Sequence, residues 1–265
     1  MKVVRETAVA GKTIYRNIKV PSGRHSDKRK PRMNPTSEKV QKNNDRLAAR
    51  NLTLLLNANF SEKSGHFVLT YAENEPTQEE AEKELKKFIR RLQYGMKKSG
   101  QEMKYIVVTE YKHKRIHHHI VINTLDAEMV NNAWAKGYTK MVALDDTGNY
   151  QKLAEYLIKE TSKTFREPGS THHRRWSGSR NLVRPVIKRE YVSESALSDD
   201  PKPIDGYVIP EVRRYEHPVT GLEYIEYFMV AVEEPRRYKI WPRGEAVSGK
   251  EYYKPEINEQ EEIGW

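Results

Sequence analysis

The sequence of 265 residues contains no cysteine. A disulfide framework and a thiolate metal site are therefore both excluded, and any bound metal must be held by nitrogen and oxygen ligands. Such ligands suit hard or borderline ions. The chain is also long enough to build a hydrophobic core without a disulfide or a structural metal.

Long apolar runs are missing as well. No stretch approaches the roughly 18 apolar residues of a membrane span, and the N-terminal MKVVRETAVAGKTIYRN lacks the apolar region and cleavage site of a secretory signal. We therefore expect a cytoplasmic protein without membrane contact. A phosphate-binding loop is also lacking, because Glu6 stands where a P-loop ending in Gly11–Thr13 requires its first glycine.

Acidic residues are scarce in the first part of the chain. Residues 1–50 hold 14 Lys and Arg against 4 Asp and Glu, which accounts for the whole net charge of +10. A second basic excess lies at 161–190, whereas 191–265 is acidic. Two basic segments and an acidic end indicate a polyanion bound on one face, the alternative being an ordinary solvated charged surface.

Composition also suggests a division of the chain. Residues 20–46 are polar, basic and interrupted by proline, with little to bury. We expect a basic arm over 1–46, mobile or ordered by a partner, and a folded body over 47–193. The Pro-rich, acidic SESALSDDPKPIDG marks a boundary, beyond which 194–265 forms an extension with a β-hairpin.

The body alternates strands and helices, which predicts an α+β fold with helices packed on an antiparallel sheet. Thr77 and Glu80 form a capping-box pattern at the start of one amphipathic helix, and 149–163 has the pattern of another. The expected strands are 65–74, 104–111, 115–123, YTKMVAL and, at an edge because of Pro185, LVRPVIKREYV.

Three consecutive histidines occur in KRIHHHIVIN at 114–123. Because alternate side chains of a strand share a face, His117 and His119 project to one side and His118 to the other. If the preceding hairpin turns symmetrically, Glu110 stands opposite His117 on the same face. Two imidazoles and a carboxylate suit Mn²⁺, Mg²⁺, Fe²⁺, Co²⁺ or Zn²⁺, while the alternative is an exposed basic strand with incidental histidines.

The order HFVLTY, helix, VVTEY, RIHHHIVIN and a helix containing YLIK resembles the HUH endonuclease superfamily, specifically the rolling-circle replication initiators (Rep proteins) of small phages and plasmids. The resemblance covers about residues 65–190. It implies a ferredoxin- or RRM-like sheet and a Mn²⁺ or Mg²⁺ cofactor held by His117, His119 and, as third ligand, Glu110.

The same resemblance implies a nucleophilic tyrosine with a lysine three residues on, which here are Tyr156 and Lys159. Tyr150 competes for this role, but Leu153 follows it at that spacing. His118 departs from the family pattern, in which a bulky apolar residue is usual. We expect His118 to lie at a strand edge or to bind phosphate.

Arginines surround a tryptophan in HHRRWSGSRNLVRP at 172–185. Arginine contacts to phosphates and stacking of bases on tryptophan are common ways to hold single strands, and related initiators carry similar stretches. The alternative is a charged loop with one anchoring aromatic side chain. The predicted DNA contacts are Arg174, Arg175, Trp176, Arg180, Asn181 and Arg184.

These features predict a rolling-circle initiator that nicks and rejoins single-stranded DNA at a replication origin through a 5′-phosphotyrosine, with the helicase and polymerase of a bacterial host. One alternative is a non-catalytic nucleic-acid-binding module with a degenerate site. Another is an Fe(II) enzyme with two histidines and a carboxylate. The Fe(II) enzyme is disfavoured because all three ligands fall on one tight hairpin and the basic arm would have no role.

Overall fold

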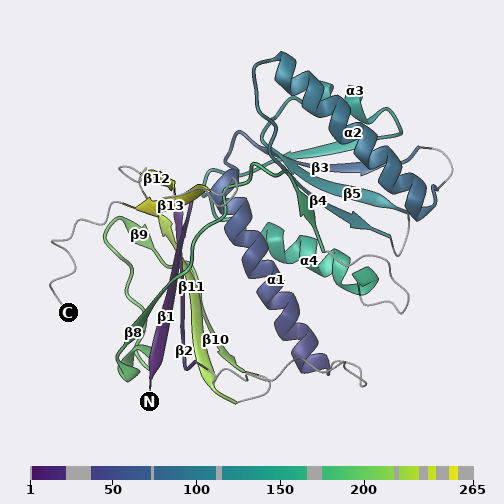
Figure 1. Ribbon diagram of the computed structural model, residues 1–265. Coiled ribbons are helices and arrows are strands. Elements are labelled where there is room, and N and C mark those ends of the chain that lie inside the picture. The colour runs from purple at the N-terminus through teal and green to yellow at the C-terminus, as the bar shows by residue number, and fades with distance from the viewer. Residues whose placement is uncertain are drawn as a thin grey trace. The chain divides into compact units, whose positions relative to one another are not determined.

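The computed structural model describes residues 2–21, 37–72, 75–111, 115–165, 175–217, 221–232, 238–242 and 251–255. The fold is α+β, with antiparallel sheets and helices, which confirms the predicted class. The chain divides into a central unit, residues 59–182, and a terminal unit, residues 1–58 with 183–265 (Figure 1). Among the described helices, none has the length and apolar character needed to cross a membrane.

The central unit is built on a five-stranded sheet whose neighbours are all antiparallel, in the order β6-β3-β5-β4-β7. Along the chain, β3, a helix, β4, β5, a second helix and β6 follow one another, and β5 lies between β3 and β4. This is the split βαβ arrangement of ferredoxin-like folds. The strands are β3 (Gly65–Thr70), β4 (Tyr105–Glu110), β5 (His117–Ile122), β6 (Thr139–Ala143) and β7 (Ser177–Gly178).

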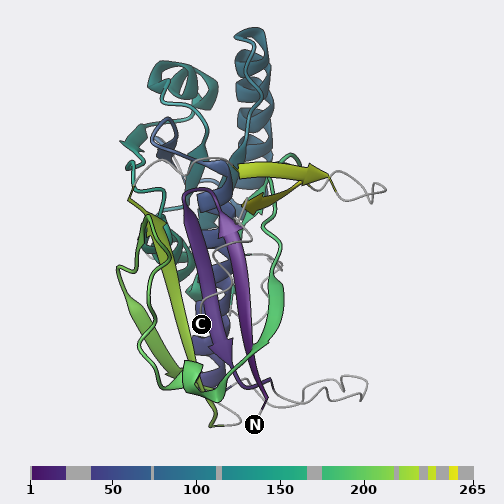
Figure 2. The same cartoon turned by 90° about the vertical axis from the view of Figure 1, so that its left-hand side faces the viewer.

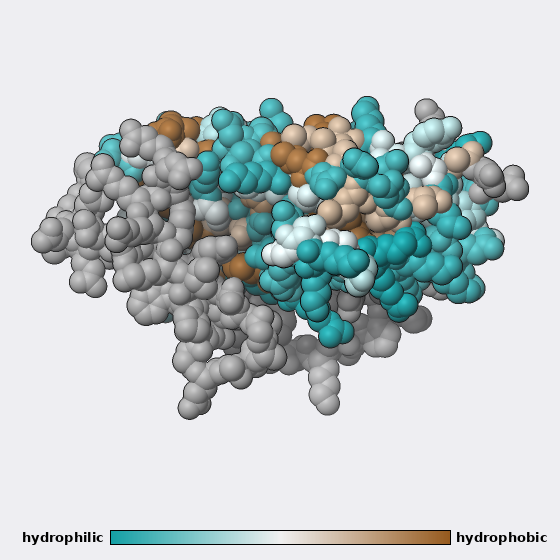
Figure 3. Space-filling view, turned by 90° about the horizontal axis from the view of Figure 1, so that it is seen from above, coloured by the Kyte–Doolittle hydropathy of each residue, from teal (hydrophilic) through white to brown (hydrophobic). Residues whose placement is uncertain are grey.

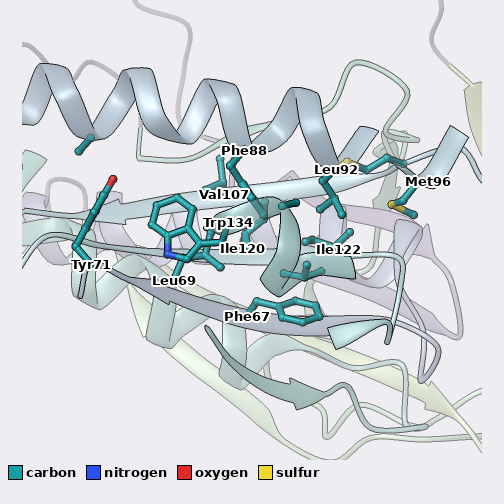
Figure 4. Packing of buried hydrophobic residues seen from close by; sticks show 14 of the residues in the cluster. Phe67, Leu69, Tyr71, Phe88, Leu92, Met96, Val107, Ile120, Ile122 and Trp134 are labelled. Carbon is teal, nitrogen blue, oxygen red and sulfur yellow. The ribbon is translucent and has the colours of Figure 1, made fainter. Parts of the chain in front are cut away.

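Helices α2 (Gln78–Lys98) and α3 (Ala127–Trp134) cover one face of this sheet (Figure 1). The predicted capping box begins α2: Glu80 N donates to Thr77 Oγ1 at 3.3 Å, and Thr77 N donates to Glu80 Oε2 at 2.8 Å. The outer side of α2 is charged, and hydrophilic residues cover much of the face seen in Figure 3. The core beneath includes Phe67, Leu69, Phe88, Leu92, Ile120 and Trp134 (Figure 4).

Helix α4 (Gln151–Phe165) packs on the opposite face of the sheet, against β4 (Figure 1). Its buried stripe consists of Ala154, Leu157 and Ile158, as the helical period predicts. Tyr156 and Lys159 therefore lie on the exposed side of the same helix.

The terminal unit contains a second antiparallel sheet, in the order β10-β11-β2-β1-β8, with β9 pairing with β11. Helix α1 (Glu38–Asn59) packs on it through Leu54 and Ala58, which contact Tyr15 and Phe228. Figure 2 shows the long strands of this sheet. They are β1 (Val3–Ala10), β2 (Thr13–Lys19), β8 (Lys188–Val192), β9 (Tyr207–Val208), β10 (Val212–Glu216) and β11 (Glu223–Ala231). A 3₁₀ turn η1 (Glu194–Leu197) and the paired strands β12 (Tyr238–Pro242) and β13 (Glu251–Pro255) complete the described elements.

The N-terminal region differs from the expected basic arm. Residues 3–19 form a hairpin because Val3, Val9, Ile14 and Ile18 are buried on one face of the terminal sheet. Gly11, with φ of 58°, makes the turn and lies against the backbone of α1. Helix α1 also begins within the expected arm, whereas 22–36 fall outside the described residues. The domain boundaries at 46/47 and 193/194 stay predictions.

The last predicted strand of the body belongs to a different sheet from the one expected. Strand β8 pairs with β1 in the terminal unit, where it is an edge strand, and not with the sheet that carries the histidines. The hairpin predicted beyond the acidic boundary is present as β10 and β11, and β11 also pairs with β2.

Candidate active site

The register of the β4–β5 hairpin determines the candidate metal site. Glu110 pairs with His117 and Val108 with His119, which confirms the symmetric turn expected from the sequence. The three polar side chains project from the face on which α4 packs. One potential ligand atom from each of Glu110, His117 and His119 lies within 4.8 Å of the others.

The ring of His117 is oriented by its backbone. Its Nδ1 lies 2.9 Å from the Arg115 carbonyl oxygen, which can only accept a hydrogen bond, so Nδ1 carries the proton of the neutral ring. The Nε2 lone pair then lies 3.0 Å from Oε2 of Glu110, a buried carboxylate. Two electron-rich atoms so placed form a favourable site for a cation.

The ring of His119 is buried, and its two nitrogens have different surroundings. Nδ1 lies 3.1 Å from Nε2 of His66, a residue of β3. Nε2 is buried and has no hydrogen-bond partner in the described part of the chain. A buried polar atom without a partner is costly, and a metal ion would satisfy it. The residues present therefore fit a divalent metal.

Both His66 and His119 are neutral at pH 7. Burial lowers the pKa of His66 to about 4 and, together with the neighbouring histidines, that of His119 to about 3. Metal ligation requires the neutral imidazole, so the protein environment keeps His119 in a form suited to binding a metal ion.

Sequence reasoning missed His66. The signal was present, because His66 alternates with Val68 and Thr70 along β3 and therefore shares their face. The segment from Phe67 to Tyr71 was interpreted as structural, and the sequence alone does not show that β3 pairs with β5.

The structure brings Tyr156 to this cluster. Its side chain is 43% exposed, and its ring centroid lies 5.4 Å from that of His119 at an interplanar angle of 88°. Partial burial, with smaller effects from the carboxylates of Glu160 and Glu110, raises the pKa of Tyr156. The phenol is therefore protonated at neutral pH. Lys159 is exposed one turn further along α4.

Tyr150 has different surroundings. Its side chain is 3% exposed, and its hydroxyl donates a hydrogen bond of 3.1 Å to the Asp145 carbonyl oxygen. Burial raises the pKa of Tyr150 well above its usual range. Its hydroxyl is thus occupied by a local contact.

The expectation for His118 was wrong. The residue lies on central strand β5, fully buried on the face covered by α2 and α3. Its ring is hydrogen-bonded to the hydroxyls of Tyr71, at 3.0 Å, and Thr109, at 2.8 Å, and it packs on Trp134. Because β5 has a neighbouring strand on each side, the alternate residues on this face enter the core.

The predicted DNA contacts have varied surroundings. Arg174 falls outside the described residues, Trp176 is half-buried, and Arg180 is exposed. The Asn181 amide nitrogen donates to the Met103 carbonyl oxygen at 3.2 Å, which ties this loop to the central unit. Arg175 is half-buried in the central unit, and Arg184 is exposed in the terminal unit. Their contacts with DNA stay predictions.

Comparison with known families points to replication. Residues 66–165 match the family model described as Replication-associated protein ORF2. The matched segment runs from β3 to the end of α4 and contains Glu110, His117, His119 and Tyr156. No curated protein and no solved structure matches the chain. The family match supports a replication initiator.

Proposed function

We propose that this protein nicks and rejoins single-stranded DNA at a replication origin, with Tyr156 as the nucleophile and a divalent metal as cofactor. The observation that carries the proposal is the packing of Tyr156 against His119, whose buried Nε2 lacks a partner among the described residues beside two further potential ligands. All of these residues lie in the segment that matches the replication family.

Glu110, His117 and His119 would hold Mn²⁺ or Mg²⁺, because nitrogen and carboxylate ligands without thiolates suit these ions. Once bound, such an ion supplies positive charge that polarises the scissile phosphate. The phenol of Tyr156 needs this assistance, because it is protonated at neutral pH and is a weak nucleophile.

In the proposed reaction, the Tyr156 oxygen bonds to the phosphorus and loses its proton to solvent. The bond between phosphorus and the 3′-oxygen breaks, and the leaving oxygen takes up a proton. The products are a 5′-phosphotyrosine and a free 3′-OH that a host polymerase extends while a host helicase unwinds the duplex. Attack of a 3′-OH on the phosphotyrosine reverses these steps and rejoins the strand.

The decisive experiment uses the unmodified protein. Incubation with single strands that span candidate origins, in the presence of Mn²⁺, is expected to give a covalent protein–DNA adduct that survives denaturation. If every strand is bound and none is captured, the chain is a binding module without catalytic activity.

Lys159→Ala is expected to slow adduct formation by about 10- to 100-fold without abolishing it, because the cation stabilises phosphate charge but does not form the new bond. The adduct is measured over time on denaturing gels. Lys97→Ala provides a control, since this exposed lysine lies on α2, across the sheet from the site. A rate unchanged by Lys159→Ala would show that the lysine has no role in the reaction.

Salt dependence tests the basic segment at 20–46. Each phosphate neutralised on a single strand contributes about −0.7 to the slope of log affinity against log salt. Removing 1–46 is not a clean test, because it deletes β1, β2 and part of α1. Replacing its cations with glutamine is expected to flatten the slope and leave cleavage of a saturating oligonucleotide unchanged. The replaced residues are Arg24, Lys28, Arg29, Lys30 and Arg32.

A control with the same change in charge replaces five cations of α2, on the sheet face away from the histidines, and is expected to leave the slope unaltered. Those residues are Lys83, Lys86, Arg90, Lys97 and Lys98. An equal effect of the two sets would mean that only net charge matters and that 20–46 does not contact DNA.

A further inference from the structure

We propose that His66 is a positioning residue that determines which ring nitrogen of His119 carries the proton, so that the Nε2 lone pair is available to a metal. The inference rests on the metal site proposed above. It assigns a role to a residue that, in the expected arrangement of ligands, had none.

The two rings are neighbours on one face of the sheet. Val68 pairs directly with His119 in the β3–β5 ladder, and His66 lies two residues before it, in the diagonal position. The rings are nearly parallel, with an interplanar angle of 20° and centroids 5.3 Å apart. Nε2 of His66 and Nδ1 of His119 are separated by 3.1 Å, a hydrogen-bond distance.

A hydrogen bond between two neutral imidazoles needs one donor and one acceptor, which leaves two arrangements. In the first, His119 donates from Nδ1, and its Nε2 has a free lone pair. In the second, His66 donates from Nε2, and His119 carries its proton on Nε2. Only the first arrangement offers a ligand atom beside Glu110 and His117.

His66 is well suited to this role because of the surroundings of the His119 ring. Within the described part of the chain, the contact with His66 is the one hydrogen bond made by His119. Val68, directly across the strand, is apolar and cannot accept a proton. The other ring contacts, with His117 and Tyr156, are edge-to-face packing. Partners of metal-binding histidines commonly determine the tautomer in this way.

The stacked arrangement also restricts how the His119 ring rotates. His66 lies along its face, while Tyr156 meets it at 88°. A rotation of the ring about its Cβ–Cγ bond would break the hydrogen bond and disturb the contact with the proposed nucleophile. His66 therefore connects the orientation of the metal ligand with that of Tyr156.

The test combines a tautomer measurement with a metal titration. In the metal-free protein, ¹⁵N NMR of labelled histidines is expected to show His119 protonated on Nδ1. His66→Phe keeps a ring but removes the acceptor, so His119 is expected to shift toward protonation on Nε2. Calorimetry with Mn²⁺ should then show about 10- to 100-fold weaker binding.

Two further variants separate hydrogen bonding from packing. His66→Gln supplies an amide oxygen of similar reach and is expected to keep the Nδ1 tautomer and Mn²⁺ affinity within about threefold of the unmodified protein, well short of the loss typical for a missing partner. Val68→Ala removes volume beside His119 without touching the hydrogen bond, and it should leave the tautomer unchanged.

The proposal is overturned if His119 of the unmodified, metal-free protein carries its proton on Nε2. It is also overturned if His66→Phe binds Mn²⁺ as the unmodified protein does, or if His66→Gln is as defective as His66→Phe. The first measurement needs no variant, so it decides even if His66→Phe does not fold. These readouts involve no DNA, and a correct tautomer without adduct formation would count against the proposed function alone.

Discussion

Replacement of Tyr156 with phenylalanine is expected to lower covalent adduct formation by at least about 10⁴-fold, because loss of a covalent nucleophile can cost on the order of 10⁶ in rate. The variant lacks only the oxygen that would bond to phosphorus. The side chain is 43% exposed and its ring contact with His119 is preserved, so folding and Mn²⁺ binding should be unchanged. Denaturing gels and calorimetry measure the two properties separately.

Tyr150→Phe is the matched control on the same stretch of chain. It removes the hydrogen bond to the Asp145 carbonyl and should cost about 1 kcal/mol of stability while retaining the adduct. Peptide mapping of the adduct then identifies the nucleophile directly. A nucleotide attached to Tyr150, or to any tyrosine outside 149–163, would show that Tyr156 is not the residue that reacts.

His119→Ala should weaken Mn²⁺ binding by more than about 100-fold and abolish nicking, since loss of a direct ligand exceeds the 10- to 100-fold cost of losing an outer partner. His117→Ala should have a similar effect. Both residues provide atoms within 4.8 Å of the other potential ligands. Calorimetry with Mn²⁺ in the absence of DNA measures the loss.

His118→Leu is the control for this pair. The leucine resembles the apolar residue usual in the family, and it faces away from the proposed metal. It should preserve Mn²⁺ affinity but lower the free energy of unfolding by about 1–3 kcal/mol, because Tyr71 and Thr109 lose a buried hydrogen-bond partner. Equal Mn²⁺ affinity in all three variants would refute the assignment of the ligands.

Local patterns predicted the site well. The alternation of side chains and a symmetric turn were enough to place Glu110 opposite His117. The capping box at Thr77 and the helical period that puts Tyr156 on the exposed side of α4 were also readable from short stretches. Each of these features depends on residues close together in the sequence.

Features that depend on distant pairing were not predictable. His66 reaches His119 only because β3 lies beside β5, more than 50 residues later in the chain. The terminal sheet joins β1 and β2 to strands beyond residue 187, and the excess of positive charge in 1–50 concealed their alternating apolar side chains. His118 was misjudged for the same reason, since the position of β5 within the sheet follows from pairing and not from its own residues.

The direct pairing of Glu110 with His117 has a consequence for how this sequence can change in length. Insertions between Tyr111 and Ile116 lengthen the connection and leave the ladder intact, so homologues are free to differ there. An insertion of one residue inside β5 would instead exchange its two faces, turning His118 outward and sending the ligands into the apolar core. Evolution by small insertions and deletions is therefore open to the loop but closed to the strands on either side.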